Sequence, residues 1–119
     1  MRGIQKGVAK MKLVIAIIQT RDKGRVVDAL RANQFKFTQI ASSGGFLREG
    51  NTTLLIGIED DRLEPLLQLL EENCHTREQY INPIPPDTAP IGTFLPTPIA
   101  VEVGGAVVFV LPVERFERF

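Results

Sequence analysis

The sequence predicts an α+β domain in which two amphipathic helices cover one face of an antiparallel sheet. Three observations support this prediction. Short apolar runs rich in β-branched residues recur along the chain, two stretches carry valine or leucine at helical spacing, and polar or glycine-rich breaks separate them. The predicted order is strand, helix, strand, strand, helix, strand, which is the ferredoxin-like split βαβ pattern. An added hairpin and a long proline-rich loop follow, and the length of 119 residues suits one domain.

The N-terminal part of the domain begins with an apolar run at residues 13–18. This run is continuous and mostly β-branched, which is typical of a strand that is buried on both faces. Residues 24–33 then place Val26, Val27 and Leu30 at helical spacing, which predicts the first helix. Asp22 is expected to cap the start of this helix.

A glycine-rich loop joins the second and third predicted strands, at residues 35–41 and 52–58. The loop makes the two strands an antiparallel hairpin. It contains three glycines and Phe46, whereas a plain hairpin needs only two turn residues. This favours a binding loop, with a long plain connection as the alternative. Alternate residues of the second strand are expected to share one face: Phe35, Phe37, Gln39 and Ala41.

The second predicted helix follows an acidic stretch that suits the positive end of a helix dipole. Pro65 fits the first turn of this helix, where its missing N–H costs nothing. The acidic residues Asp60 and Asp61 are therefore interpreted as helix-start residues in preference to catalytic carboxylates. An amphipathic stripe is expected to face the sheet: Leu63, Leu66, Leu67, Leu70 and Cys74.

The C-terminal third contains a short strand at residues 77–84 and a long connection at 82–98 that holds six prolines. Two more strands are predicted at residues 99–103 and 106–113. Gly104 and Gly105 between them are expected to form a tight hairpin turn. Because the strands are apolar on both sides, the sheet needs a second cover, and no remaining segment is long enough to provide it. Other copies of the chain are therefore expected to cover it in a closed homo-oligomer.

Composition narrows the classes of function. Acidic and basic residues balance at 14 each, which argues against nucleic acid as a partner. Cys74 is the single cysteine, so an intrachain disulfide is excluded and a reducing cytoplasm is expected. The apolar runs are far shorter than the roughly 20 residues that span a bilayer, so no membrane partner is expected. Residues 1–10 are expected to form a flexible extension before the domain at residues 11–119.

Three motifs resemble those of the bacterial cyclic-di-AMP receptors of the PII-like signal-transduction class. They are the glycine-rich loop at residues 43–53, the run at residues 101–113, and Asn73-Cys74-x-x-Arg77-Glu78. The resemblance covers residues 11–119. It implies a PII-like, ferredoxin-like homotrimer that binds one cyclic dinucleotide at each subunit interface without catalysis. It further implies a cytoplasmic signalling sensor that relays ligand binding by loop rearrangement to a downstream protein, with no cofactor and no metal.

The resemblance also implies a set of ligand-binding residues. Thr38 would hydrogen-bond a nucleotide, Phe46 would pack on a base, and Asn51 would read a base or phosphate through its amide. Lysine and arginine would supply charge at a phosphate, from positions where the family commonly has arginine and glutamine. Gln34 likewise replaces a common asparagine. The full predicted set is Lys36, Thr38, Gly45, Phe46, Leu47, Asn51, Gly57, Phe109 and Arg118.

Two other classes of function stay open at this point. A PII-like protein that binds another adenine nucleotide, ATP or ADP, fits the same motifs. An enzyme would depend on Cys74, His75 or the Asp60 and Asp61 pair. The cysteine is better interpreted as a core thiol and the histidine as a residue at a helix end, and no GxxxxGK[ST] phosphate-binding motif is present.

Overall fold

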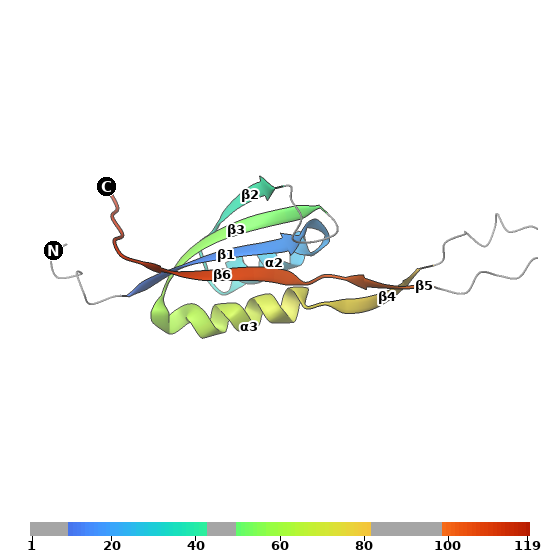
Figure 1. The fold of residues 1–119 in the computed structure, drawn as a ribbon. Coiled ribbons are helices and arrows are strands. Elements are labelled where there is room, and N and C mark those ends of the chain that lie inside the picture. The colour runs from blue at the N-terminus through green and yellow to red at the C-terminus, as the bar shows by residue number, and fades with distance from the viewer. Residues whose placement is uncertain (1–9, 43–49, 82–98) are drawn as a thin grey trace, which may run out of the picture.

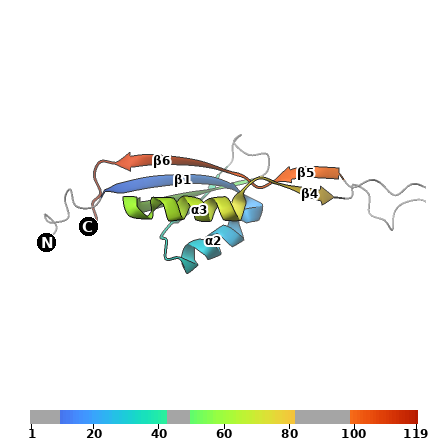
Figure 2. The same cartoon turned by 90° about the horizontal axis from the view of Figure 1, so that it is seen from below.

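The structure is a computed structural model that describes residues 10–42, 50–81 and 99–119. A four-stranded antiparallel sheet with strand order β2-β3-β1-β6 forms one layer, and two helices form the other (Figures 1 and 2). This arrangement confirms the predicted α+β, ferredoxin-like fold. The elements in order are β1 (Met11–Gln19), η1 (Thr20–Asp22), α2 (Lys23–Ala32), β2 (Thr38–Ser42), β3 (Asn51–Glu59), η2 (Asp60–Arg62), α3 (Leu63–Cys74), β4 (Arg77–Ile81), β5 (Ile99–Val103) and β6 (Ala106–Val113).

The core lies between the sheet and the helices. Alternate residues of β1 and β3 are buried there, because successive side chains of a strand point to opposite faces. Leu67, expected in the apolar stripe of α3, is half-exposed, while Leu69 is buried. The helix contacts α2 as well as the sheet, so its buried arc is wider than a single stripe. The central core residues are Val14, Ala16, Ile18, Val26, Leu30, Leu54, Ile56, Leu66, Leu70 and Cys74.

The second strand is shorter than expected, because β2 begins at Thr38 and not at Phe35. Gln34 has a φ of +62°, which turns the chain out of α2. Phe35 then packs into the core, and the guanidinium carbon of Arg62 lies 4.1 Å from the centroid of its ring. The predicted shared face that began with Phe35 and Phe37 is therefore wrong at its first residues, since packing takes them out of the strand.

The predicted hairpin turn at Gly104 and Gly105 is also wrong. β5 pairs with β4 in a separate two-stranded ribbon, whereas β6 pairs with β1 in the main sheet. The two glycines, at φ of +83° and +98°, carry the chain from one sheet to the other (Figure 1). A Cβ at Gly104 would lie 2.7 Å from the backbone carbonyl oxygen of His75, and the positive φ disfavours other residues, so this crossing requires glycine. The added hairpin of the fold is thus the β4–β5 ribbon, which lies beyond the end of α3.

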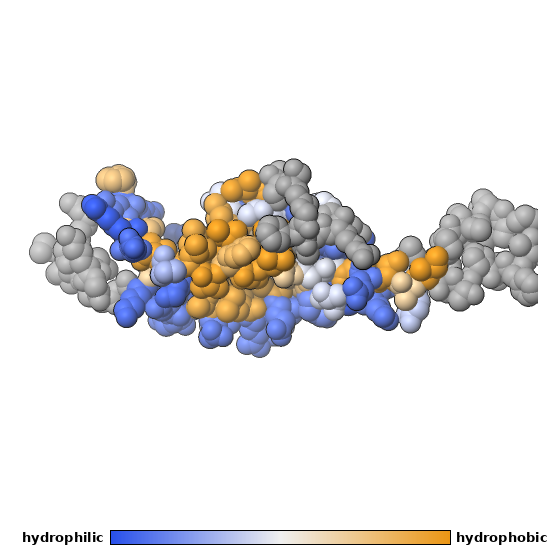
Figure 3. Space-filling view, viewed as in Figure 1, coloured by the Kyte–Doolittle hydropathy of each residue, from blue (hydrophilic) through white to orange (hydrophobic). Residues whose placement is uncertain are grey.

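The sheet face opposite the helices, here called the open face, is apolar and only partly buried. Figure 3 shows a hydrophobic area over the sheet on the side that faces the viewer. No helix in residues 10–42, 50–81 or 99–119 covers this face. No helix in the described residues is long and apolar enough to cross a membrane. The large apolar residues of the open face include Leu13, Ile15, Ile17, Ile40, Leu55, Val107, Phe109 and Leu111.

Candidate functional site

Several of the predicted ligand-binding residues lie on the open face or at its edges. Thr38 is the first residue of edge strand β2 and is exposed, and Lys36 lies just before it, also exposed. Phe109 lies on the opposite edge strand, β6, and is 43% exposed. Three members of the predicted set, Gly45, Phe46 and Leu47, lie outside the described residues.

Thr38 and Phe109 belong to one row of side chains across the sheet. Thr38 is opposite Leu55, Leu55 is opposite Ile15, and Ile15 is opposite Phe109. Three strand spacings separate the two ends of this row, roughly 14 Å at 4.8 Å per spacing. The two residues between them have no side-chain hydrogen-bonding groups. Within this row, a polar ligand would therefore find side-chain hydrogen-bonding partners only at the Thr38 end.

Gly57 lies in β3 on the same face, opposite Leu13 of β1. It is exposed, and a Cβ built at this position would meet no atom of the described residues within 4 Å. This position therefore leaves open space on the open face, where another group can approach the backbone closely.

The start of β3 is held firmly where the glycine-rich loop rejoins the sheet. The carbonyl of Gly50 accepts a 2.8 Å hydrogen bond from the N–H of Thr20, and the hydroxyls of Thr20 and Thr52 share one of 3.3 Å. Asn51 is only 7% exposed and lies opposite Gln19 of β1. This end of the sheet therefore has a fixed backbone beside a predicted ligand-binding amide.

Arg118 lies far from this end within one chain. It belongs to the tail that follows β6, and the end of β6 pairs with Met11, whereas Asn51 pairs with Gln19. Eight strand steps separate Met11 from Gln19, roughly 26 Å at 3.3 Å per residue. The structure thus brings the start of β3 and the C-terminal tail to opposite ends of the sheet (Figure 1).

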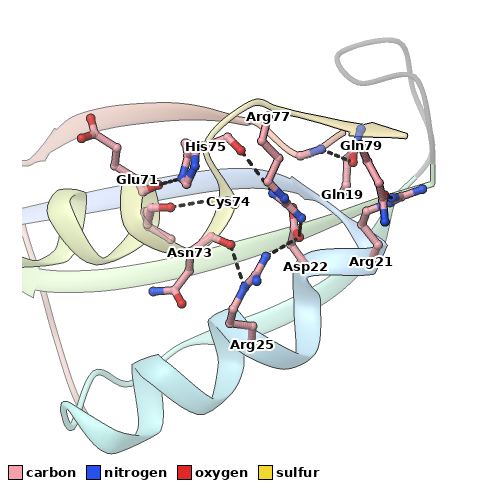
Figure 4. Close-up of polar contacts among 12 residues, drawn as sticks. Gln19, Arg21, Asp22, Arg25, Glu71, Asn73, Cys74, His75, Arg77 and Gln79 are labelled. Atoms are coloured by element: carbon pink, nitrogen blue, oxygen red, sulfur yellow. Dashed lines mark hydrogen bonds and ion pairs between the residues drawn. The ribbon is translucent and has the colours of Figure 1, made fainter. Parts of the chain in front are cut away.

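A buried ionic cluster at the end of β1 was missed at the sequence level. Asp22 is 1% exposed, and its Oδ1 accepts hydrogen bonds from Nη2 of Arg25 at 2.9 Å and from Nη2 of Arg77 at 2.8 Å (Figure 4). Asp22 is the N-cap residue of α2, as expected, but its side chain makes no capping hydrogen bond and binds the two arginines instead. The two arginines also donate to the carbonyls of Asn73 and His75. One carboxylate therefore joins α2, the end of α3 and β4.

Two further hydrogen bonds attach the β4–β5 ribbon to the same end of β1. Oε1 of Gln19 accepts a 2.7 Å hydrogen bond from the N–H of Gly104, and Nη1 of Arg21 donates to Oε1 of Gln79 at 3.0 Å (Figure 4). Sequence separations of 85 and 58 residues explain why no local pattern indicated these contacts.

The residues on which an enzyme would depend, Cys74, His75 and Asp60, each contact a neighbouring residue of the fold. Cys74 is buried, and its thiol donates to the carbonyl of Leu70 at 2.7 Å. Burial raises the pKa of this thiol from 9.0 to about 11, and the nearby carboxylate of Asp22 adds to the effect. Cys74 is fully buried within the core cluster, so the interpretation as a core thiol is confirmed; the raised pKa is the opposite of the lowered pKa that a catalytic cysteine needs. Nδ1 of His75 lies 3.1 Å from the carbonyl of Glu71 at the end of α3, and Asp60 forms a 2.9 Å ion pair with Lys12.

A surface cleft of about 290 Å³ lies between the end of α3 and the start of β6. Leu70, Cys74, His75 and Val108 are among its lining residues. This cleft is on the helix side of the sheet, away from the row that contains Thr38. Within the described ranges, no group of three or more His, Cys, Asp or Glu side chains is placed to hold a metal ion.

A ferredoxin-like sheet with one open apolar face and a ribbon inserted before the last strand defines a protein of the PII-like class. The crystal structure of Arabidopsis thaliana PII bound to citrate matches with a TM-score of 0.57 and 20% identity, over 88% of this chain and 76% of that chain. A DUF3240 family protein from Shewanella baltica OS155 matches with a TM-score of 0.53 and 18% identity, over 92% and 96%. At these identities the likeness concerns the fold alone.

Comparison of the sequence with protein families assigns this chain to a group more specific than the PII-like class. The sequence model of the cyclic-di-AMP receptor family matches residues 11–119, and this chain belongs to that family. A crystal structure of a functionally unknown protein from Pediococcus pentosaceus ATCC 25745 matches with a TM-score of 0.76 and 41% identity, over 92% of this chain and 98% of that chain.

Proposed function

We propose that this protein is a signalling sensor that binds cyclic-di-AMP at the subunit interfaces of a homotrimer. Ligand binding reorders loops, and a downstream protein recognises the changed surface. The protein acts in the cytoplasm and without catalysis. Family membership supports the class of ligand, and the protonated, buried thiol of Cys74 and the backbone contact of His75 give no support to an active site there.

The observation that carries the proposal is the position of Thr38 and Phe109. Both lie on the open face, at opposite edges of the sheet, with only apolar side chains between them. Where the β2 edge of one copy meets the β6 edge of another, both residues can contact one ligand.

The apolar open face supports the assembly. An antiparallel sheet that faces water usually alternates apolar and polar residues, so that its outer face is polar. Here Ile15, Leu55 and Phe109 are adjacent on the outer face. Large exposed apolar patches mark interaction surfaces, and a second copy of the chain offers a complementary apolar surface.

Assembly is tested by sedimentation velocity on the wild-type chain and on Ile15→Lys. The wild type is expected at three times 13.2 kDa, and Ile15→Lys at a lower mass, because the lysine charge would be desolvated in the interface. Gln68→Lys is the matched control, since Gln68 is exposed on α3 and already contacts Glu72. A monomeric wild type, or a trimeric Ile15→Lys, would contradict the proposed interface.

Ligand binding is tested by isothermal titration with cyclic-di-AMP, with ATP and ADP as competitors in a thermal-shift assay. Gly57→Ala is the most specific variant, because the added methyl would meet no atom of the described residues within 4 Å. It is expected to fold normally and to lose cyclic-di-AMP binding at least tenfold, about 1.4 kcal/mol. No heat with cyclic-di-AMP at tens of micromolar protein would refute the proposal, and a stronger thermal shift with ATP would favour the other adenine nucleotide.

A further inference from the structure

Four consecutive residues at the end of β1 contact two separate parts of the molecule. Residues 19–22, here called the connecting segment, comprise the last residue of β1 and the turn η1. Thr20 bonds to Gly50 and Thr52 at the start of β3. The other three residues of the segment bond to the base of the β4–β5 ribbon: Gln19 to Gly104, Arg21 to Gln79 and Asp22 to Arg77.

We propose that the connecting segment couples the start of β3 to the β4–β5 ribbon, so that a ligand held beside Asn51 changes the stability of the ribbon. This inference rests on the proposed function for the identity of the ligand. It goes further by naming the residues through which binding at the open face reaches a part of the chain outside the main sheet.

The geometry of the segment explains why the two ends would respond together. Thr20, Arg21 and Asp22 form a single turn of 3-10 helix, so a displacement of one residue moves the other two. Gly50 is joined to Thr20 directly, because its carbonyl accepts the 2.8 Å hydrogen bond from the N–H of Thr20. A shift of the backbone at Gly50 is therefore transmitted to the turn through this bond.

Asp22 is the residue most sensitive to such a shift. Its carboxylate is buried, and a buried charge is tolerated only while its cationic partners stay in place. Its Oδ1 holds Arg25 and Arg77, while its Oδ2 has no hydrogen-bond partner among the described residues. Because Oδ1 accepts both hydrogen bonds, a small movement of η1 weakens the bond between Asp22 and Arg77 of β4. Oδ2 makes no hydrogen bond among the described residues that would compensate for this loss.

The ribbon depends on these contacts for its order. A two-stranded hairpin is marginally stable by itself in water. Glu78 and Glu102 lie directly opposite each other in the ribbon, and like charges in that arrangement are destabilising. Modest changes in the contacts at the base of the ribbon therefore have a large effect on the exchange of the ribbon's backbone amide hydrogens with solvent.

Hydrogen exchange of the full-length chain tests the coupling, with cyclic-di-AMP as the probe. In the wild type, saturating ligand is expected to change exchange in β4 and β5 by about fivefold or more. In Asp22→Asn, the titration should still show binding, but ribbon exchange should be fast and independent of ligand. Asp28→Asn is the matched control, since Asp28 is an exposed aspartate of α2, and it should behave as the wild type. A ribbon in Asp22→Asn that responds to ligand as in the wild type would overturn the proposal, as would a wild-type ribbon unaffected by bound ligand.

A ligand-free experiment separates failure of the coupling from failure of the proposed function. Thr20→Val removes the hydroxyl contact with Thr52 and is expected to speed ribbon exchange about fivefold, with no further effect in an Asp22→Asn background. Additive effects, or no effect of Thr20→Val on the ribbon, would overturn the coupling even if cyclic-di-AMP binds. If Asp22→Asn does not fold, Gln79→Ala replaces it in both experiments, because Gln79 is exposed and joins the ribbon to Arg21.

Discussion

The pH dependence of stability above pH 8 should identify Cys74 as a core thiol. Its pKa is raised from 9.0 to about 11, so the folded chain keeps the thiol proton over a range where the unfolded chain loses it. The folded state then binds more protons than the unfolded state, and the free energy of unfolding falls as pH rises. The contribution is complete below about pH 9 and is lost by about pH 11, in total on the order of 2–3 kcal/mol.

Urea unfolding followed by circular dichroism suits this measurement, because the chain has no tryptophan. The relevant quantity is the difference in unfolding free energy between wild type and Cys74→Ala at one protein concentration, because contributions common to the two proteins cancel. The alanine variant loses packing and the bond to Leu70 at every pH, but it loses no proton. The difference between the two proteins should therefore narrow by about 2–3 kcal/mol between pH 8 and pH 11.

A difference that stays constant with pH would refute this reasoning. A difference that widens as pH rises from 6 to 8 would mean that the folded pKa is lowered, as for an activated nucleophile. That result would restore the enzyme hypothesis for Cys74 and His75. A thiol reagent gives an independent check, since a buried, protonated Cys74 should react slowly at pH 8 until urea unfolds the chain.

The remaining predictions concern glycine positions and the core. Gly104→Ala should destabilise the fold by more than about 1 kcal/mol, because φ is +83° and the new Cβ would lie 2.7 Å from the backbone carbonyl oxygen of His75. Gly24→Ala should instead stabilise it by about 0.5–1 kcal/mol, since its Cβ meets nothing within 4 Å inside α2; equal urea midpoints for the two variants would contradict this account. Leu66→Ala should cost about 2–5 kcal/mol, because the side chain is fully buried. Leu67→Ala, at a half-exposed position of the same helix, should cost less, and a similar loss from both would argue against the observed orientation of α3.

The elements with the clearest periodicity were predictable from sequence. The apolar run of β1, the alternation of β3 and the leucine spacing of α3 each report burial directly, so the strands and helices they predict are confirmed. Errors occurred where a local pattern admits two structures. Two glycines between apolar runs are typical of a hairpin turn, but here they join two sheets, because β6 buries its apolar residues against β1. Phe35 likewise alternates as in a strand and yet packs below Arg62.

The candidate site was predictable only in part. The motifs identified the family, and the family match over residues 11–119 agrees with them. The nine ligand-binding residues stay a prediction. The structure adds that Thr38 and Phe109 stand at opposite edges of one face, which no motif spacing indicates.

The sequence by itself determined the fold class, the two helices, the presence of the four strands of the main sheet, and the family of the protein. These features depend on local periodicity and contiguous motifs, which a chain carries in its own order of residues. Only the tertiary structure decided that the β4–β5 ribbon is separate from the main sheet, and that Asp22 joins it to β1 through Arg77. Those contacts link residues 55 or more positions apart, and they form because burial of the core brings the ends of β1, α3 and β4 together around one carboxylate.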